Sequence, residues 1–175
     1  MPKSKFRSST KQAPVSSADA KEQLDSFLAK YTPEIAAFAR RALAKMRRIV
    51  PGAVELVYDN YNALAIGFGP SERASEAIFS IALYPSCVRL FFLQGKGLPD
   101  PAKRLEGSGN VVRSVRLFGE GEADTNLLDD PEIRELMNVA LNRAKVPMLA
   151  GVRRKLMIKS ASAKQRPRRP RGKAE

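Results

Sequence analysis

Two Gly-x-Gly motifs in the middle of the chain flank a pair of basic residues, and this pattern could bind an anion through backbone amides. The candidate anion loop consists of Lys96, Lys103, Arg104, Gly107 and Gly109. The motifs match neither the phosphate-binding P-loop nor the dinucleotide-binding pattern between a strand and a helix. The alternative is that these glycines only provide the turn geometry of a loop. Two interpretations therefore stay open, a binder or enzyme for a small anionic ligand and a structural loop.

Other residues give enzymatic chemistry little support. The chain contains no histidine, the commonest general base, and one cysteine, which can form neither an intrachain disulfide nor a zinc site. Cys87 begins an apolar run that ends at Leu93, so we expect it to be buried and unreactive. Tyr58, Asp59 and Tyr61 could form a polar cluster, but a turn that ends a strand is the preferred interpretation. The sequence predicts no catalytic residue, no metal ligand and no cofactor.

Positive charge is concentrated at the two ends of the chain. The 175 residues include 31 Lys and Arg against 18 Asp and Glu, a net charge of +13. Four basic and no acidic residues lie in 1–16, and seven basic residues against one acidic residue lie in 159–175. Both ends are polar and interrupted by proline, so 1–16 and 161–175 are predicted to be disordered tails. Deleting the C-terminal tail should then leave the stability of the domain unchanged.

The C-terminal tail is the preferred site for nucleic acid. Its arginines can bind phosphates, and its prolines keep the segment extended. It has no aromatic residue that would stack on bases, so we expect weak binding with little sequence preference. The expected phosphate contacts are Lys164, Arg166, Arg168, Arg169, Arg171 and Lys173.

Three helices are expected around these segments. Helical periodicity begins at Ser17, which can cap a first helix, and Thr32 can cap a second helix over 33–50. The polar side of this second helix is a further candidate surface for nucleic acid or anionic lipid, and it carries Arg40, Arg41, Lys45, Arg47 and Arg48. A third helix begins at Asp130, before Pro131, and ends by Pro147.

Short apolar or alternating runs predict strands over 63–68, 77–84, 87–93 and 111–118. The segment 152–160 is a candidate for a last strand with Leu156 and Ile158 inward, and 53–58 fits a helix or a strand equally. No apolar run is long enough to span a membrane, and we expect a cytoplasmic protein. This order predicts one α+β domain over 17–160, with an antiparallel sheet of about five strands covered on one face.

The central stretch also carries a characteristic series of turn motifs. They are Tyr84-Pro85-Ser86, Leu90-Phe91-Phe92, Gly95-x-Gly97-Leu98, Asp100-Pro101 and Leu105-Glu106-Gly107-Ser108-Gly109, followed by Arg113. With these motifs and the Asp130-Pro131-Glu132 helix start, the chain from 17 to 160 resembles the YdhG-like domain family of bacteria. Most members of that family have no assigned function, and some have been likened to frataxins, which are iron chaperones. The resemblance supplies no catalytic residues.

A frataxin-like iron chaperone is therefore one alternative function. Such iron binding relies on exposed carboxylates, because hard cations prefer oxygen ligands. The acidic residues that cluster here are Glu120, Glu122, Asp124, Asp129, Asp130, Glu132 and Glu135. Helix capping already accounts for the last four, and the chain has no histidine ligand. The preferred function is a non-enzymatic binding or accessory protein with weak nucleic-acid association through its tails.

Overall fold

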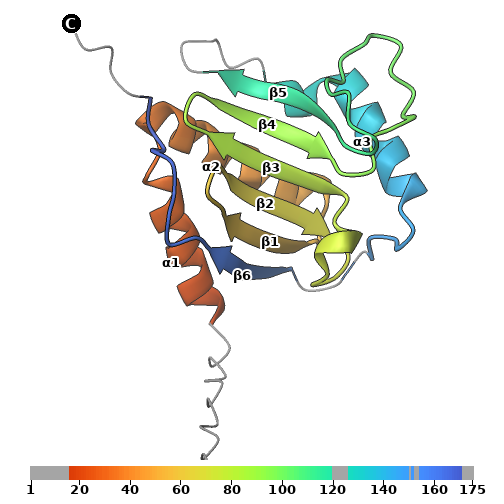
Figure 1. Cartoon of the computed structure of the whole chain (residues 1–175). Helices are drawn as coiled ribbons and strands as arrows, with labels where there is room; N and C mark the ends of the chain where they lie inside the picture. Colours follow the sequence, from red (N-terminus) through yellow and green to blue (C-terminus); the bar gives the residue numbers. More distant parts are fainter. Residues whose placement is uncertain (1–15, 120–125, 150, 152–153, 171–175) are drawn as a thin grey trace, which may run out of the picture.

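The computed structural model describes residues 16–119, 126–149, 151 and 154–170. These residues form an α+β domain in which helices pack on one face of a sheet (Figure 1). The helices are α1 (Ser17–Leu28), α2 (Pro33–Ile49) and α3 (Pro131–Arg143), and two 3₁₀ turns are η1 (Ala74–Glu76) and η2 (Leu127–Asp129). The strands are β1 (Val54–Asp59), β2 (Leu64–Gly69), β3 (Phe79–Tyr84), β4 (Cys87–Phe92), β5 (Arg113–Gly119) and β6 (Lys155–Ala161).

The sheet confirms the α+β class and differs from the expectation in two details. It has six strands in the order β5-β4-β3-β2-β1-β6, rather than about five. Strands β1 to β5 form an antiparallel meander, whereas β6 pairs in parallel with β1. The parallel pair arises because a long connection through α3 returns the chain to the free edge of β1, and only a long crossover permits that direction. The undecided segment 53–58 is β1.

Local capping explains where the helices begin. Ser16, rather than the expected Ser17, caps α1, and it forms a capping box with Asp19. Thr32 caps α2 as predicted, since its hydroxyl accepts the Ile35 N–H at 3.4 Å. Asp130 likewise caps α3. None of the helices in the described ranges is long and apolar enough to cross a membrane.

Strand β4 distinguishes the two faces of the sheet. Every second residue, namely Val88, Leu90 and Phe92, is buried in the core shared with α2. The intervening residues are half-buried and point to the opposite face, and they include Cys87 and Phe91. Cys87 is thus not fully buried, contrary to the expectation, because its register places it on the second face. Figure 1 looks onto this second face, with α2 behind the sheet, and we call it the open face.

The C-terminal segment corrects the predicted domain boundary. Residues 162–170 do not extend away as a disordered tail but return along the end of the sheet and past α1 (Figure 1). The Ser162 N–H donates to the Asp59 carbonyl at 2.8 Å, and the Arg166 N–H donates to the Tyr61 carbonyl at 2.9 Å. We call residues 162–170 the strap. The remainder of this tail, 171–175, and residues 1–15 of the N-terminal tail lie outside the described residues.

Candidate nucleic-acid interface

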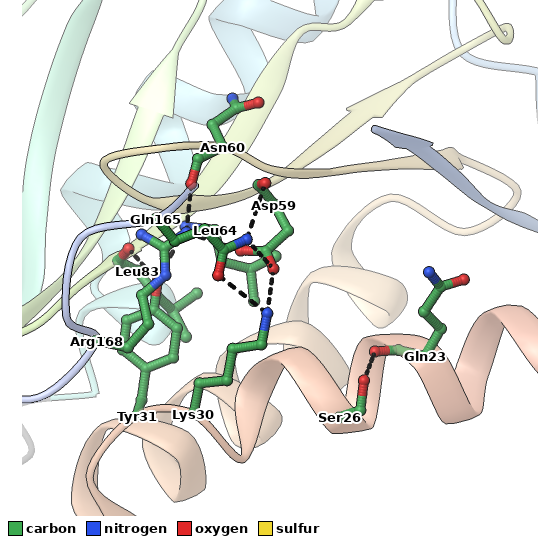
Figure 2. Close-up of polar contacts among 10 residues, drawn as sticks. All are labelled: Gln23, Ser26, Lys30, Tyr31, Asp59, Asn60, Leu64, Leu83, Gln165 and Arg168. Atoms are coloured by element: carbon green, nitrogen blue, oxygen red, sulfur yellow. Dashed lines mark hydrogen bonds and ion pairs between the residues drawn. The ribbon is translucent and has the colours of Figure 1, made fainter. Parts of the chain in front are cut away.

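The strap is held by a buried carboxylate at the end of β1. Asp59 is fully buried, and three side chains converge on it (Figure 2). Lys30 Nζ and Gln165 Nε2 each lie 2.6 Å from Asp59 Oδ2, and Arg168 Nη2 lies 2.8 Å from Oδ1. Lys30 also donates to Gln165 Oε1 at 3.0 Å. We call these four residues the clasp, and they join the turn after α1 to β1 and the strap.

Arg168 is the buried member of the strap. Its side chain is 3% exposed, its guanidinium lies 5.7 Å from the centre of the Tyr31 ring, and Nη2 also donates to the Asn60 carbonyl. The Nε and Nη1 atoms are buried without a hydrogen-bond partner. Arg168 thus points into the protein, so the prediction that it contacts phosphate is wrong for this residue. Its charge anchors the strap by neutralising Asp59.

Tyr31 packs against the clasp through its ring, which lies next to the Arg168 guanidinium. Its hydroxyl donates to the Leu83 carbonyl at 2.9 Å and accepts the Leu64 N–H at 3.0 Å, so it ties the turn between α1 and α2 to two strands. Burial raises the pKa of Tyr31 to about 12, because the phenolate would be poorly solvated there. The hydroxyl is therefore neutral at physiological pH and holds a structural position.

The other strap cations face outward. Lys164 is exposed, and the exposed Arg166 guanidinium lies 5.6 Å from the centre of the Tyr61 ring. Arg169 donates to the Tyr31 carbonyl at 3.2 Å and the Ala29 carbonyl at 3.4 Å, where α1 ends. The anchored strap therefore presents three cations on a defined backbone. Two further predicted contacts, Arg171 and Lys173, lie outside the described residues.

A hollow of about 580 Å³ runs beside these cations. We call it the strap hollow, and it is lined by Asn62, Tyr84, Pro85, Arg166, Pro167, Arg169 and Pro170. These described residues include two arginines and no acid. Burial raises the pKa of Tyr84, so the ring is uncharged at neutral pH. The lining suits an anionic ligand with planar groups.

The predicted polar cluster of Tyr58, Asp59 and Tyr61 does not form one site. Asp59 belongs to the buried clasp, Tyr58 points to the open face, and Tyr61 lies in the next turn under Arg166. No signal in the sequence indicates that Tyr61 and Tyr84 contact the strap, because the strap begins only at residue 162. The docking of the strap brings Tyr61 and Tyr84 close to Arg166 and Arg169.

The candidate anion loop is engaged with the protein itself. Asp100 accepts the backbone N–H groups of Arg104 at 2.8 Å and Leu105 at 2.7 Å. The Arg104 guanidinium lies 3.1 Å from Asp130 and 2.8 Å from Glu132. A carboxylate of the chain thus already occupies amides that an external anion would need. The geometry favours the structural interpretation of this loop.

The rest of the loop is exposed and spread out. Lys96, Lys103, Gly107 and Gly109 are all exposed, and none of them lines the strap hollow. Gly107 has a φ of +119°, a conformation that favours glycine, so it is required by the turn. These residues are not brought together into a site.

Three acidic residues of the predicted cluster, Asp129, Asp130 and Glu132, have partners within the protein. Asp129 pairs with Lys45 and Asn126, and its hydrogen bond to Lys45 lowers its pKa. Asp130 and Glu132 bind Arg104, as described above. No group of three or more acidic or cysteine residues within the described ranges could hold a metal ion. Glu120, Glu122 and Asp124 lie outside those ranges.

Part of the basic side of α2 is engaged in contacts within the protein. Arg47 binds the buried Glu55 through two hydrogen bonds of 2.9 and 2.8 Å, and hydrogen bonding to Glu55 raises the pKa of Arg47. Lys45 is held by η2, Arg40 lies 3.6 Å from Asp25, and Arg41 lies over the Phe38 ring. Arg40, Arg41 and Arg48 stay exposed, so this surface is a second candidate for nucleic acid beside the strap.

No protein-family model matches the chain, and neither a curated protein nor a solved structure matches it. The resemblance to the YdhG-like family therefore stays a prediction.

Proposed function

We propose that this chain is a non-enzymatic, cytoplasmic accessory protein that binds nucleic acid through the phosphate contacts of its strap. The observation that carries the proposal is the anchoring of Arg166 and Arg169 beside a hollow whose described lining has no acid, with Lys164 exposed on the same strap. Cations on a fixed backbone lose less conformational entropy on binding than cations on a disordered tail. Arginine also suits phosphate, because its planar guanidinium can donate two hydrogen bonds at once.

The alternatives have less support. A small anionic ligand at the glycine loop would compete with Asp100 for the loop amides. A frataxin-like iron role would need carboxylates that are not already committed to helix caps and ion pairs, whereas Asp129, Asp130 and Glu132 are committed. Membership of the YdhG-like family is compatible with the strap proposal and adds no residue to it.

The salt dependence of binding tests the proposal. With Arg168 buried, five C-terminal cations remain for phosphates: Lys164, Arg166, Arg169, Arg171 and Lys173. Each neutralised phosphate of duplex DNA contributes about −0.9 to the slope of log affinity against log salt, so the slope should be no steeper than about −4.5. Fluorescence anisotropy with a labelled oligonucleotide at several salt concentrations measures this slope.

Matched variants locate the contact. Lys164→Gln/Arg166→Gln should weaken binding and flatten the duplex slope by about 1.8. Lys21→Gln/Lys145→Gln removes the same charge from exposed positions outside the strap and should leave the slope nearly unchanged. Equal weakening by both pairs would mean that only net charge matters, and absence of binding at low salt would refute the proposal.

A further inference from the structure

A second hollow continues from the strap onto the open face of the sheet. This face hollow has a volume of about 390 Å³, and it shares Asn62 and Tyr84 with the strap hollow. The two hollows therefore form one continuous surface, from the strap cations at the end of the sheet to the middle of the open face. Figure 1 shows that no helix covers the centre of this face.

Small residues form the floor of the face hollow. Ala65 on β2 lies opposite Ala82 on β3. Ser80 precedes Ala82 by two residues on β3, so its side chain is on the same face, and all three residues line the hollow. Ala82 and Ser80 are buried and Ala65 is half-buried, so this floor lies between the larger side chains on either side. Small side chains at these positions leave room for the hollow, and most of its lining residues are apolar or aromatic.

Aromatic rings stand around this floor. Tyr84 lies opposite Cys87, and Phe91 lies opposite Ser80. The backbone positions that carry the two rings are therefore four residues apart along the strand direction, about 13 Å. Tyr61, the ring beneath Arg166, lines the same hollow and is 42% exposed. Rings at this separation can contact different bases of one strand. None of the described residues that line the face hollow is acidic.

We infer that the open face binds the bases of single-stranded nucleic acid while the strap cations hold its phosphates. This inference rests on the proposed function and specifies its ligand. Bases of a single strand can turn outward and stack on aromatic side chains, whereas bases of a duplex are paired and stacked with one another. The positive charge of Arg166 and Arg169 in the adjoining hollow complements a phosphate backbone. This charge favours a single strand of nucleic acid over a neutral peptide as the ligand.

The test compares a labelled oligothymidine of about 12 nucleotides with a duplex of equal length, using the full chain. The single strand should bind more tightly at equal salt. Tyr84→Leu/Phe91→Leu should lower single-strand affinity by roughly 5- to 100-fold per ring and leave duplex affinity unchanged. Tyr84→Phe/Phe91→Tyr keeps both rings and should bind like the wild type. Circular dichroism and urea denaturation confirm that each variant is folded.

The outcomes separate this inference from the proposed function. Equal affinity for single strand and duplex, or no effect of the leucine variant, overturns the base-binding inference while strap binding stands. Loss of both ligands at low salt overturns the proposed function itself. A concentration-dependent dimer that the leucine variant abolishes, with single-strand affinity unchanged, would assign the open face to a second copy of the chain and also overturn the inference.

Discussion

The clasp should respond unequally to the loss of its two charged partners, Asp59 and Arg168. Asp59→Asn leaves Arg168, whose side chain is 3% exposed, and Lys30 without their counter-charge. Removing one partner of a buried ion pair costs about 3–5 kcal/mol. Release of the strap lets Arg168 reach water and limits the loss, so we expect about 3 kcal/mol.

Arg168→Met should cost much less. The substitution removes two buried nitrogen atoms that have no hydrogen-bond partner, and Asp59 keeps Lys30 and Gln165 at 2.6 Å. Because Lys30 still neutralises Asp59, no uncompensated buried charge remains, and we expect the loss of one charged hydrogen bond, about 1.5 kcal/mol. Lys164→Met, an exposed change in the same strap, serves as the control and should stay within about 0.5 kcal/mol.

Urea denaturation followed by circular dichroism gives the free energies of unfolding, and thermal scans give the midpoints. For a chain of this size, 3 kcal/mol corresponds to roughly 6–12 °C. Deleting 162–175 should lower the midpoint as Asp59→Asn does, because it removes two of the three side chains that bind Asp59. An Asp59→Asn variant as stable as the wild type, or equal losses for Asp59→Asn and Arg168→Met, would refute this reasoning.

Three shorter predictions concern other parts of the domain. The pKa of Tyr31 is raised from 10.0 to about 12, so its contribution to stability is fully present below pH 10 and is lost as the pH rises towards 12. The free energy of unfolding should fall in this range by at most about 1.4 kcal/mol per pH unit. In denaturation experiments at graded pH, Tyr31→Phe should remove this part of the pH dependence. Gly95→Ala should lower the free energy of unfolding by about 1–3 kcal/mol, because a Cβ atom would lie 2.9 Å from the Arg113 backbone nitrogen. A Cβ atom at Gly109 meets nothing within 4 Å, so Gly109→Ala should be neutral or stabilising in the same urea assay. Asp130→Ala should cost about 1–2 kcal/mol through the lost cap of α3; unchanged stability together with weaker binding in a ferrous iron titration would instead favour a metal role.

The helices could be predicted because their signals are local. Thr32 before Pro33, and Asp130 before Pro131, are caps that act within three residues, and the apolar spacing of α2 follows from the same segment. Strand β1 was ambiguous for an opposite reason. Glu55 and Asp59 are buried inside it, and each depends on basic residues from elsewhere in the chain, so the polar pattern did not indicate burial.

The candidate site could not be predicted in the same way. The composition of residues 162–170 is that of a disordered segment, and what orders it is a contact between Arg168 and Asp59, 109 residues apart. Composition describes how a segment behaves alone, whereas a buried ion pair depends on tertiary structure. Tyr84 and Phe91 were assigned to strands correctly, but their placement on one face required the register of β3 and β4.

The parallel pairing of β6 with β1 also has a consequence for biosynthesis. β1 is made about a hundred residues before β6, so during translation its outer edge has no partner, and Val54 to Val57 can form hydrogen bonds with other nascent chains. The meander from β1 to β5 can pair as it emerges, but closing the β1 edge must wait until residues 155–161 have left the ribosome. Aggregation before that point, rather than the equilibrium stability of the finished domain, would then limit the yield of folded protein.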